Sequence, residues 1–221
     1  MKNNHRVDVA AQRRAKMKLT LMRAGFELMA LKGTSATSID DVIREAKVAR
    51  GTFYKYFAGT DELAEEIGLV LVAEVIVGFE KDLMRISDHA ERLAAGIHGV
   101  LSLVGEAPVI GRFIVRAGWP SNPLVAALMG AVSATLNEGI HEKRFGEVPL
   151  PVAEALVAGI TIGLMQEITE NGERDDLHSS AVAVVLKGLG VPPLEAHLIA
   201  SRLPSPPHFD KGILLQSLRR S

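Results

Sequence analysis

Residues 38–57 read SIDDVIREAKVARGTFYKYF, and this stretch decides the fold. Ser38 is a favourable N-cap residue, and the two aspartates that follow suit the positive end of a helix. Apolar residues recur at the spacing of a helix with one buried face, at Ile39, Val42, Ile43 and Ala46. A joint over residues 46–48 leads to a second short helix, predicted over residues 49–55. Two short helices joined this tightly form a helix-turn-helix, whose second helix can enter the major groove of DNA.

The charge of the chain is unevenly distributed around this stretch. The 221 residues carry 25 Lys and Arg against 26 Asp and Glu. Residues 1–60 hold twelve of the basic residues and five of the acidic ones, a net charge of +7, so the remainder carries −8. A basic head on an acidic body is the electrostatic footprint of nucleic-acid binding by the head, although a solvated basic face gives the same count.

Helical periodicity extends along the whole chain, and strand signals are nearly absent. Prolines and glycines divide the chain into helix-length segments. Helices are predicted at residues 13–32, 38–45, 49–55, 61–86, 88–105, 109–117, 124–145, 151–171, 176–189 and 193–202. We therefore expect an all-α fold with a three-helix head over residues 11–60, a larger helical domain over residues 61–202 and a Pro-rich tail over residues 203–221.

Composition and motifs exclude several classes of protein. The absence of cysteine removes thiolate metal sites and cysteine nucleophiles, and it fits a reducing compartment. The histidines of the body are not paired at helical spacing, and no nucleotide-binding or serine-hydrolase motif occurs. We therefore expect no enzymatic activity, no metal and no other cofactor. The N-terminus is polar and basic, and prolines interrupt the longest uncharged stretch, residues 117–137, so we expect a cytoplasmic protein without a membrane segment.

Residues 21–63 resemble the DNA-binding head of the TetR (tetracycline repressor) family of transcriptional regulators. The most specific part is the run GTFYKYF at residues 51–57, which matches the family pattern in order and spacing. The residues at matching positions are Gly33, Thr37, Ala46, Val48, Gly51, Thr52, Tyr54, Tyr56, Phe57 and Leu63. Beyond residue 63 only the helical architecture agrees, as expected of a family whose second domains diverge.

Three residues depart from the family pattern. Lys47 stands where the family usually has a glycine, so the turn either avoids a positive φ or places Lys47 under strain. Ala49 replaces the serine that caps the recognition helix and touches phosphate. Thr60 replaces a lysine, which removes a cationic phosphate contact, although Thr60 can still cap the helix that follows.

The DNA-binding residues that we expect are Thr37, Ser38, Lys47, Arg50, Gly51, Thr52, Tyr54, Lys55 and Tyr56. Arg50 can span O6 and N7 of a guanine, or can meet a phosphate instead. Thr52 can contact a thymine methyl group or a phosphate. The first two residues of the set can donate to a phosphate beside the helix dipole while capping their helix. Phe53 and Phe57 are interpreted as core.

Two helices of the body are apolar almost all round, which indicates burial against more neighbours than one small domain supplies. Residues 155–165 read ALVAGITIGLM and carry small residues at four-residue spacing. The resemblance implies that these helices pair with the same helices of a second protomer in a symmetric homodimer. The residues expected at this interface are Ala155, Gly159, Gly163, Val184, Val185 and Leu189. Burial within one protomer is the alternative.

The remaining helices would enclose a pocket for a small-molecule effector. Its predicted lining is His98, Leu101, Phe113, Arg116, Trp119, Leu128, Met129, Val132 and Gln166. The resemblance as a whole implies a ligand-responsive regulator, a repressor that binds a palindromic DNA operator as a homodimer and is released by a small molecule. The alternative, motivated by the three departures, is a helical small-molecule-binding or scaffold protein whose head has lost operator affinity.

Overall fold

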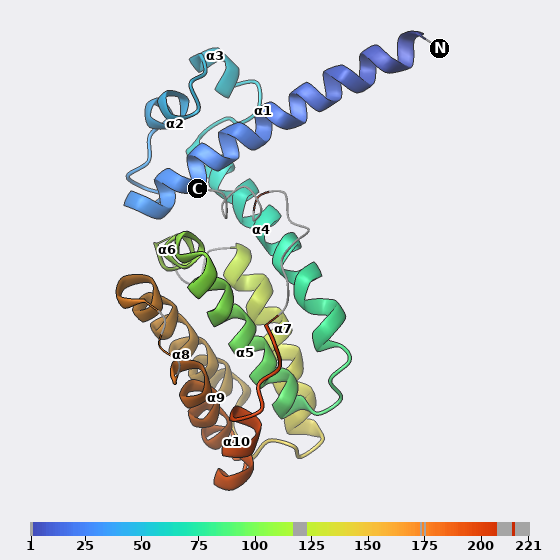
Figure 1. The fold of residues 1–221 in the computed structure, drawn as a ribbon, viewed down its shortest axis with the longest axis vertical. Coiled ribbons are helices and arrows are strands. Elements are labelled where there is room, and N and C mark those ends of the chain that lie inside the picture. The colour runs from blue at the N-terminus through green and yellow to red at the C-terminus, as the bar shows by residue number, and fades with distance from the viewer. Residues whose placement is uncertain (1, 117–122, 173, 175, 207–213, 215–221) are drawn as a thin grey trace.

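The computed structural model describes residues 2–116, 123–172, 174, 176–206 and 214, and it confirms the all-helical fold. Ten helices follow one another within these residues, as Figure 1 shows. They are α1 (Lys2–Lys32), α2 (Ile39–Glu45), α3 (Arg50–Phe53), α4 (Thr60–Leu83), α5 (His89–Glu106), α6 (Pro108–Arg116), α7 (Pro123–His141), α8 (Leu150–Asn171), α9 (Leu177–Gly188) and α10 (Pro193–Ala200).

Several helix boundaries differ from the sequence prediction; α4, for example, ends at Leu83 rather than at residue 86. Helix α1 begins at Lys2 rather than at residue 13. Residues 2–12 contain no proline or glycine that would stop a helix, and they lack the apolar periodicity from which a helix is predicted. Helix α3 ends at Phe53, and residues 54–56 continue as a turn. Helix α7 ends at His141 rather than at residue 145, since Lys143 takes a φ of 58°, outside the helical region.

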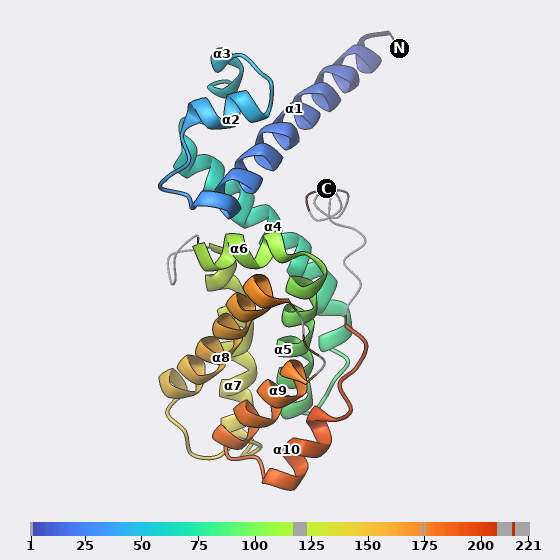
Figure 2. The same cartoon turned by 60° about the vertical axis from the view of Figure 1, so that its left-hand side comes forward.

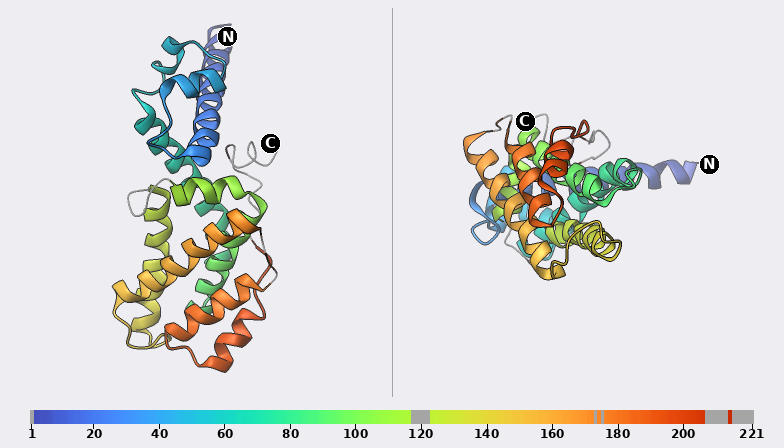
Figure 3. Two further views of the ribbon diagram at one scale, coloured as in Figure 1. Left: turned by 90° about the vertical axis from the view of Figure 1, so that its left-hand side faces the viewer. Right: turned by 90° about the horizontal axis from the view of Figure 1, so that it is seen from below.

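The helices form a head and a body joined by α4. Helices α1, α2 and α3 lie at one end of the molecule, and α5–α10 lie at the other (Figures 1 and 2). Helix α4 starts in the head and runs down into the body. Helices α8 and α9 pack against each other along one side of the body, and α10 lies at the end furthest from the head (Figure 3).

The core of the head holds α1 against the helix-turn-helix and against α4. Leu21, Val42, Phe53 and Phe57 are all buried, so the core role predicted for the two phenylalanines is confirmed. A Cβ atom at Gly25 would lie 2.6 Å from Cδ2 of Leu63, which means that α1 and α4 approach each other closely only because residue 25 has no side chain.

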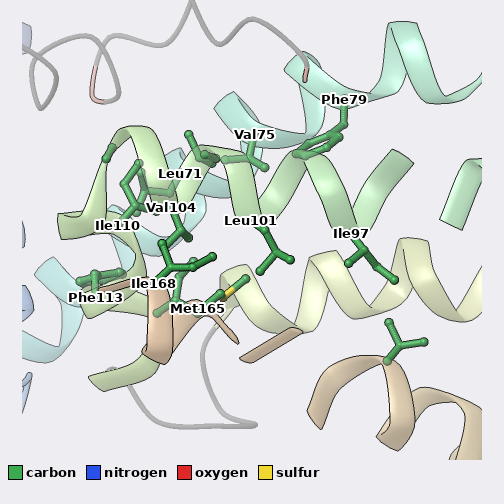
Figure 4. Close-up of a cluster of buried hydrophobic side chains, with 14 of the residues drawn as sticks. Leu71, Val75, Phe79, Ile97, Leu101, Val104, Ile110, Phe113, Met165 and Ile168 are labelled. Atoms are coloured by element: carbon green, nitrogen blue, oxygen red, sulfur yellow. The ribbon is translucent and has the colours of Figure 1, made fainter. Parts of the chain in front are cut away.

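Helices α4, α5, α6 and α8 share one cluster of buried aliphatic and aromatic side chains in the core of the body (Figure 4), to which α7 and α9 also contribute. The cluster includes Leu71, Val75, Leu101, Val104, Ile110, Phe113, Met165 and Ile168. Because α4 contributes to this cluster and also to the core of the head, the two parts cannot move independently of it.

Helix α6 forms the second junction between head and body. The ring of Phe113 lies against Phe26 of α1, with 4.8 Å between the ring centroids, and both side chains are fully buried. Nη1 of Arg116 donates to the carbonyl oxygen of Ala30, in the last turns of α1, at 3.1 Å. Phe113 and Arg116 were predicted in the effector pocket. The structure corrects this, because both side chains turn toward the head.

Helix α8 stands out by its apolar composition. Among the described residues it is the one helix with the length and hydropathy of a membrane span, and 28% of that apolar window is buried. Helices α5 and α6 taken together also have the length and hydropathy of a membrane span, but they are bent by 109° at their junction. Helix α8 packs on α5, α6, α7 and α9, which accounts for the buried part of its apolar surface.

The approach of α6 to α5 and α8 gives a stability prediction. A Cβ atom at Gly111 would lie 2.5 Å from Oγ1 of Thr169 and 2.6 Å from Cγ1 of Val104. Gly111→Ala is therefore expected to lower the free energy of unfolding by about 1–3 kcal/mol. Gly130→Ala on α7, where a Cβ meets nothing within 4 Å, is the control and should be neutral or stabilising. Equal denaturation midpoints for the two variants would contradict the prediction.

Candidate nucleic-acid interface and ligand cavity

The N-terminus of α2 is fixed by a capping box. Oγ of Ser38 accepts from the backbone N–H of Asp41 at 3.2 Å, and the Asp41 carboxylate accepts from the backbone N–H of Ser38 at 3.1 Å. The same carboxylate accepts from Lys32, at the end of α1, and from Arg44. Hydrogen bonds from Lys32 and then from Ser38 hold the pKa of Asp41 well below its usual value. The helix-turn-helix is thereby tied to the C-terminal end of α1.

Thr37 and Ser38 differ in their availability to a phosphate. Thr37 is 4% exposed, and its Oγ1 donates to the carbonyl oxygen of Gly33 at 2.8 Å. The hydroxyl is turned inward to the end of α1, and its contact with a phosphate stays a prediction. Ser38 is exposed, although its hydroxyl already donates to Asp41 at 2.7 Å.

In the turn between α2 and α3, Lys47 has the positive φ that the sequence left open. Lys47 has a φ of 54°, so it adopts the left-handed conformation that a glycine usually takes, at some cost in strain. The turn is closed by the backbone N–H of Val48, which donates to the carbonyl oxygen of Ile43 at 3.0 Å. Ala49 is the N-cap of α3 and makes no side-chain capping bond, as predicted.

Thr60 does not cap α4. It is the first residue of α4, and the carboxylate of Glu62 instead accepts the backbone N–H of Ala58 just before the helix. A residue inside the first turn cannot occupy the N-cap position, so the expected role of Thr60 is corrected.

Arg50 is the most prominent cation of the exposed α3 surface. Its Nη1 lies 3.0 Å from Oδ1 of Asp40 on α2, and both side chains are more than half exposed. A hydrogen bond with Tyr54, together with the charge of Asp40, raises the pKa of Arg50 above its usual value. Gly51 beside it is exposed and has open space around it. This part of α3 is therefore accessible to a large partner, and the surface contacts of Arg50 with Asp40 and Tyr54 are weak.

Three more of the predicted DNA-binding residues face a groove, whereas Tyr54 is exposed and lies outside its lining. Thr52, Lys55 and Tyr56 form one wall, and the N-terminal half of α1 forms the other, around a volume of about 880 Å³. Arg13 and Arg14 line the α1 wall. Sequence reasoning did not place these two arginines in the DNA-binding set, although both lie in the helix predicted over residues 13–32. The missed signal is the run of residues 2–12, which contains no helix breaker.

The body contains a mostly apolar cavity of about 590 Å³. Leu128, Met129 and Val132 of α7 line it, as the sequence predicted, and they share it with residues of α4, α5, α6 and α8. That volume is within the usual range for small-molecule sites. Whether these residues contact an effector stays a prediction.

Four polar side chains also line the cavity: Arg92, Thr135, Glu138 and Thr161. Nη1 of Arg92 lies 3.4 Å from Oε2 of Glu138, and its Nε donates to the carbonyl oxygen of Ile86 at 2.9 Å. Oγ1 of Thr161 is buried and has no hydrogen-bond partner among the described residues, so it is available to a ligand. Thr135 and Glu138 continue the helical spacing of the α7 lining, a signal that sequence reasoning did not use.

The other predicted pocket residues lie elsewhere or are not described. Leu101 is in the core, and Gln166 is exposed and donates to Glu170. Nδ1 of His98 lies 3.0 Å from Nδ1 of His178 on α9, and burial lowers the pKa of His178. Trp119 lies outside the described residues.

The small-residue row of α8 lies on the surface of the protomer. Ala155, Gly159, Gly163 and, on α9, Val184 are exposed, and a Cβ atom at either glycine would meet nothing within 4 Å. Val152, on the same helix, is 57% exposed. Val185 and Leu189 are fully buried in the protomer's own core, which corrects their assignment to an interface, because their side chains cannot reach a partner.

Comparisons with known proteins agree with this architecture. The sequence profile of bacterial regulatory proteins of the tetR family matches residues 21–67, and that of a tetracyclin repressor-like C-terminal domain matches residues 88–202. No curated protein gives a significant match.

Several solved structures are similar over nearly their whole length. RolR in complex with resorcinol is 26% identical, with a TM-score of 0.68, over 88% of this chain and 98% of that one. FadR from Bacillus subtilis in complex with stearoyl-CoA is 19% identical, with a TM-score of 0.67, over 76% and 97% of the two chains. A gamma-butyrolactone receptor described as ArpA-like is 17% identical, with a TM-score of 0.62, over 86% and 97%.

The strained turn gives a second stability prediction. Lys47→Gly should raise the free energy of unfolding by about 0.5–1 kcal/mol, since glycine adopts a positive φ without a Cβ clash but loses more backbone entropy on folding. Lys47→Ala removes the same charge and keeps the Cβ, so it serves as the matched control and should not stabilise. Thermal unfolding followed by circular dichroism measures both. A melting temperature of Lys47→Gly no higher than that of Lys47→Ala would show that the turn is unstrained.

Proposed function

The chain belongs to the TetR family of bacterial regulatory proteins, and on that premise we propose that it is a repressor that binds a palindromic DNA operator as a homodimer and leaves it when a small molecule fills the body. Family membership itself makes it a non-enzymatic DNA-binding transcriptional regulator with a ligand-binding C-terminal domain. The observation that carries the proposal is that α6 borders both the cavity and α1 of the head. We place its action in the cytoplasm, where chromosomal DNA is accessible.

The exposed surface of α3 reads the operator. Arg50 leaves its ion pair with Asp40 and spans a guanine edge, because that pair is solvent-exposed and weakly held. Gly51 lets the backbone of α3 approach the groove closely. Tyr54 and Lys55, both exposed, reach phosphates and fix the register of the head.

The homodimer forms through the exposed apolar face of α8 and α9. Ala155, Gly159 and Gly163 leave room for a second helix, and the apolar side chains of Val152 and Val184 border them. A symmetric pair then presents two heads to two half-sites of a palindrome. Burial of this face would also account for the apolar surface that α8 leaves uncovered in one protomer.

The effector is a small, mainly apolar molecule with at least one polar group. The walls of the cavity favour apolar contacts, and Thr161 together with the Arg92–Glu138 pair supplies the polar ones. RolR, whose structure contains the dihydroxylated aromatic resorcinol, supports an organic ligand of this kind.

Ligand and DNA are coupled through α6 and α4. Ile114 of α6 lines the cavity, whereas its neighbour Phe113 packs on α1 of the head. Phe79 and Leu83 bring α4 to the same cavity. A ligand that displaces these side chains tilts α1 and α4 and changes the distance between the two heads. The ligand can shift the equilibrium between the two arrangements only by the difference between its binding free energies for them.

Selection of bound sequences from random double-stranded DNA tests the proposal. We expect a palindromic motif, and binding to that motif that weakens steeply with salt. A screen of small apolar compounds for release of the DNA then tests the effector. Absence of any preferred sequence at low salt would instead favour a ligand-binding protein whose head has lost operator affinity.

Base reading by Arg50 can be separated from phosphate contact. Arg50→Ala should relax the selected base at one position in each half-site and weaken binding by about tenfold or more. Lys55→Ala, the matched loss of one positive charge, should weaken binding to all sequences alike and flatten its salt dependence. The selected motif and the dissociation constant measure both. An unchanged motif for Arg50→Ala would move base readout to another residue.

The interface can be tested by a substitution that the protomer itself tolerates. Gly159→Leu has open space in the protomer, so it should leave the fold intact but wedge the partners apart, shifting the protein toward monomer and weakening operator binding. Ala73→Leu, at an exposed site on α4, adds apolar bulk away from this face and should stay dimeric. Sedimentation measures the oligomeric state. A Gly159→Leu protein that remains dimeric would place the interface elsewhere.

A further inference from the structure

Helix α1 extends well beyond the body of the head. It runs from Lys2 to Lys32, about 45 Å at the rise of an α-helix, and its N-terminal half passes α3 and points away from the body (Figures 1 and 2). Residues 10–16 are all exposed. The helix-turn-helix packs on the later turns of α1, through residues such as Leu21 and Met29, so its fold does not require this half.

The protruding half of α1 and the α3 segment face each other across the groove of about 880 Å³. The α1 wall consists of Val9, Ala10, Arg13, Arg14 and Met17, and the opposite wall consists of Thr52, Lys55 and Tyr56. The groove therefore combines three cations, two hydroxyl groups and a strip of apolar surface.

The cations of the groove lack an acidic partner, unlike several other basic residues of the head. Lys18 pairs with Glu66 at 2.7 Å, Arg23 pairs with Glu27 at 3.0 Å, and Lys32 pairs with Asp41. In contrast, Arg13, Arg14 and Lys55 have no carboxylate within 4.0 Å among the side chains that the structure describes. Lys16 and Lys47 have none either, but they lie outside the groove lining, so the groove is the place where three unpaired cations of the described head face one space.

We propose that the groove is a second DNA-contact site, in which the sugar–phosphate backbone of one strand lies between α1 and α3. Arg13, Arg14 and Lys55 bind phosphates, and Met17 lies against a sugar. The inference rests on the proposed DNA-binding function and adds to it a contact outside the helix-turn-helix.

The position of the groove favours DNA over an acidic protein segment. One of its walls is the segment that follows Arg50 and Gly51, so a duplex with α3 in its major groove brings its flanking backbone to this place. Successive phosphates of a strand lie about 3.4 Å apart along the helix axis, which lets neighbouring phosphates meet the arginines of successive positions.

The test is salt-dependent binding of the full-length protein to the palindrome selected from random DNA. Arg13→Gln/Arg14→Gln should weaken binding at physiological salt at least tenfold, roughly, and should lower the slope of log affinity against log salt by about 3 to 4 per dimer. The selected sequence should not change, because phosphate contacts carry no direct sequence information. Arg13→Lys/Arg14→Lys keeps both charges and should restore most of the slope.

Lys16→Gln/Arg85→Gln is the matched control. It removes the same charge from two exposed residues outside the groove and should change affinity by about twofold or less. A wild-type slope and affinity for Arg13→Gln/Arg14→Gln would overturn the groove site and leave the proposed function standing. Equal losses in the control would also overturn it, since they would reflect net charge alone. Failure of the wild-type protein to bind any duplex would overturn both proposals.

Discussion

The contact of Phe113 with Phe26 is the constraint on which the rest of the structure depends. Both rings are excluded from solvent, and they belong to different parts of the molecule, one to the body and one to the head. The hydrogen bond from Arg116 to Ala30 fixes the same two helices a turn further along. Because packed cores have few intermediate arrangements, α1 and α6 must move together or separate altogether. A junction of this kind transmits a change in the body without a flexible linker.

Within the head, α2 is fixed by side-chain hydrogen bonds, whereas α3 has few of its own. Asp41 gathers hydrogen bonds from α1, from its own cap and from Arg44, so the orientation of α2 is tightly determined. Helix α3, in contrast, is a single turn without a side-chain cap, preceded by a residue with positive φ. The recognition segment thus gains order from Phe53 and Phe57 beneath it rather than from its own helical stability.

The sequence predicted the fold well and the ligand cavity poorly, for a physical reason. Helix periodicity and the GTFYKYF run depend on local chemistry, so the helix-turn-helix and its buried phenylalanines followed directly. A cavity is made by side chains from several helices at once, and periodicity says only that Phe113 or Leu101 is buried, not against what. For the same reason Val185 was assigned to an interface although it fills the protomer's own core. The arginines of α1 were missed because a polar helix has no apolar stripe to mark it.

The division of labour around the cavity has a consequence for how its chemical preference can change. On α6, the residue that lines the cavity is adjacent in sequence to the one that packs on the head, so under the proposed coupling substitutions there would alter ligand binding and release of DNA together. Helix α7 contributes Leu128, Met129 and Val132 to the same wall and packs on α4, α5 and α8. Under the proposed coupling, substitutions on α7 that keep its packing on α4 would reshape the cavity without touching the contact of α6 with α1. Substitutions on α7 are therefore the first choice for changing the ligand preference of a biosensor built on this protein, and natural sequence divergence can follow the same route.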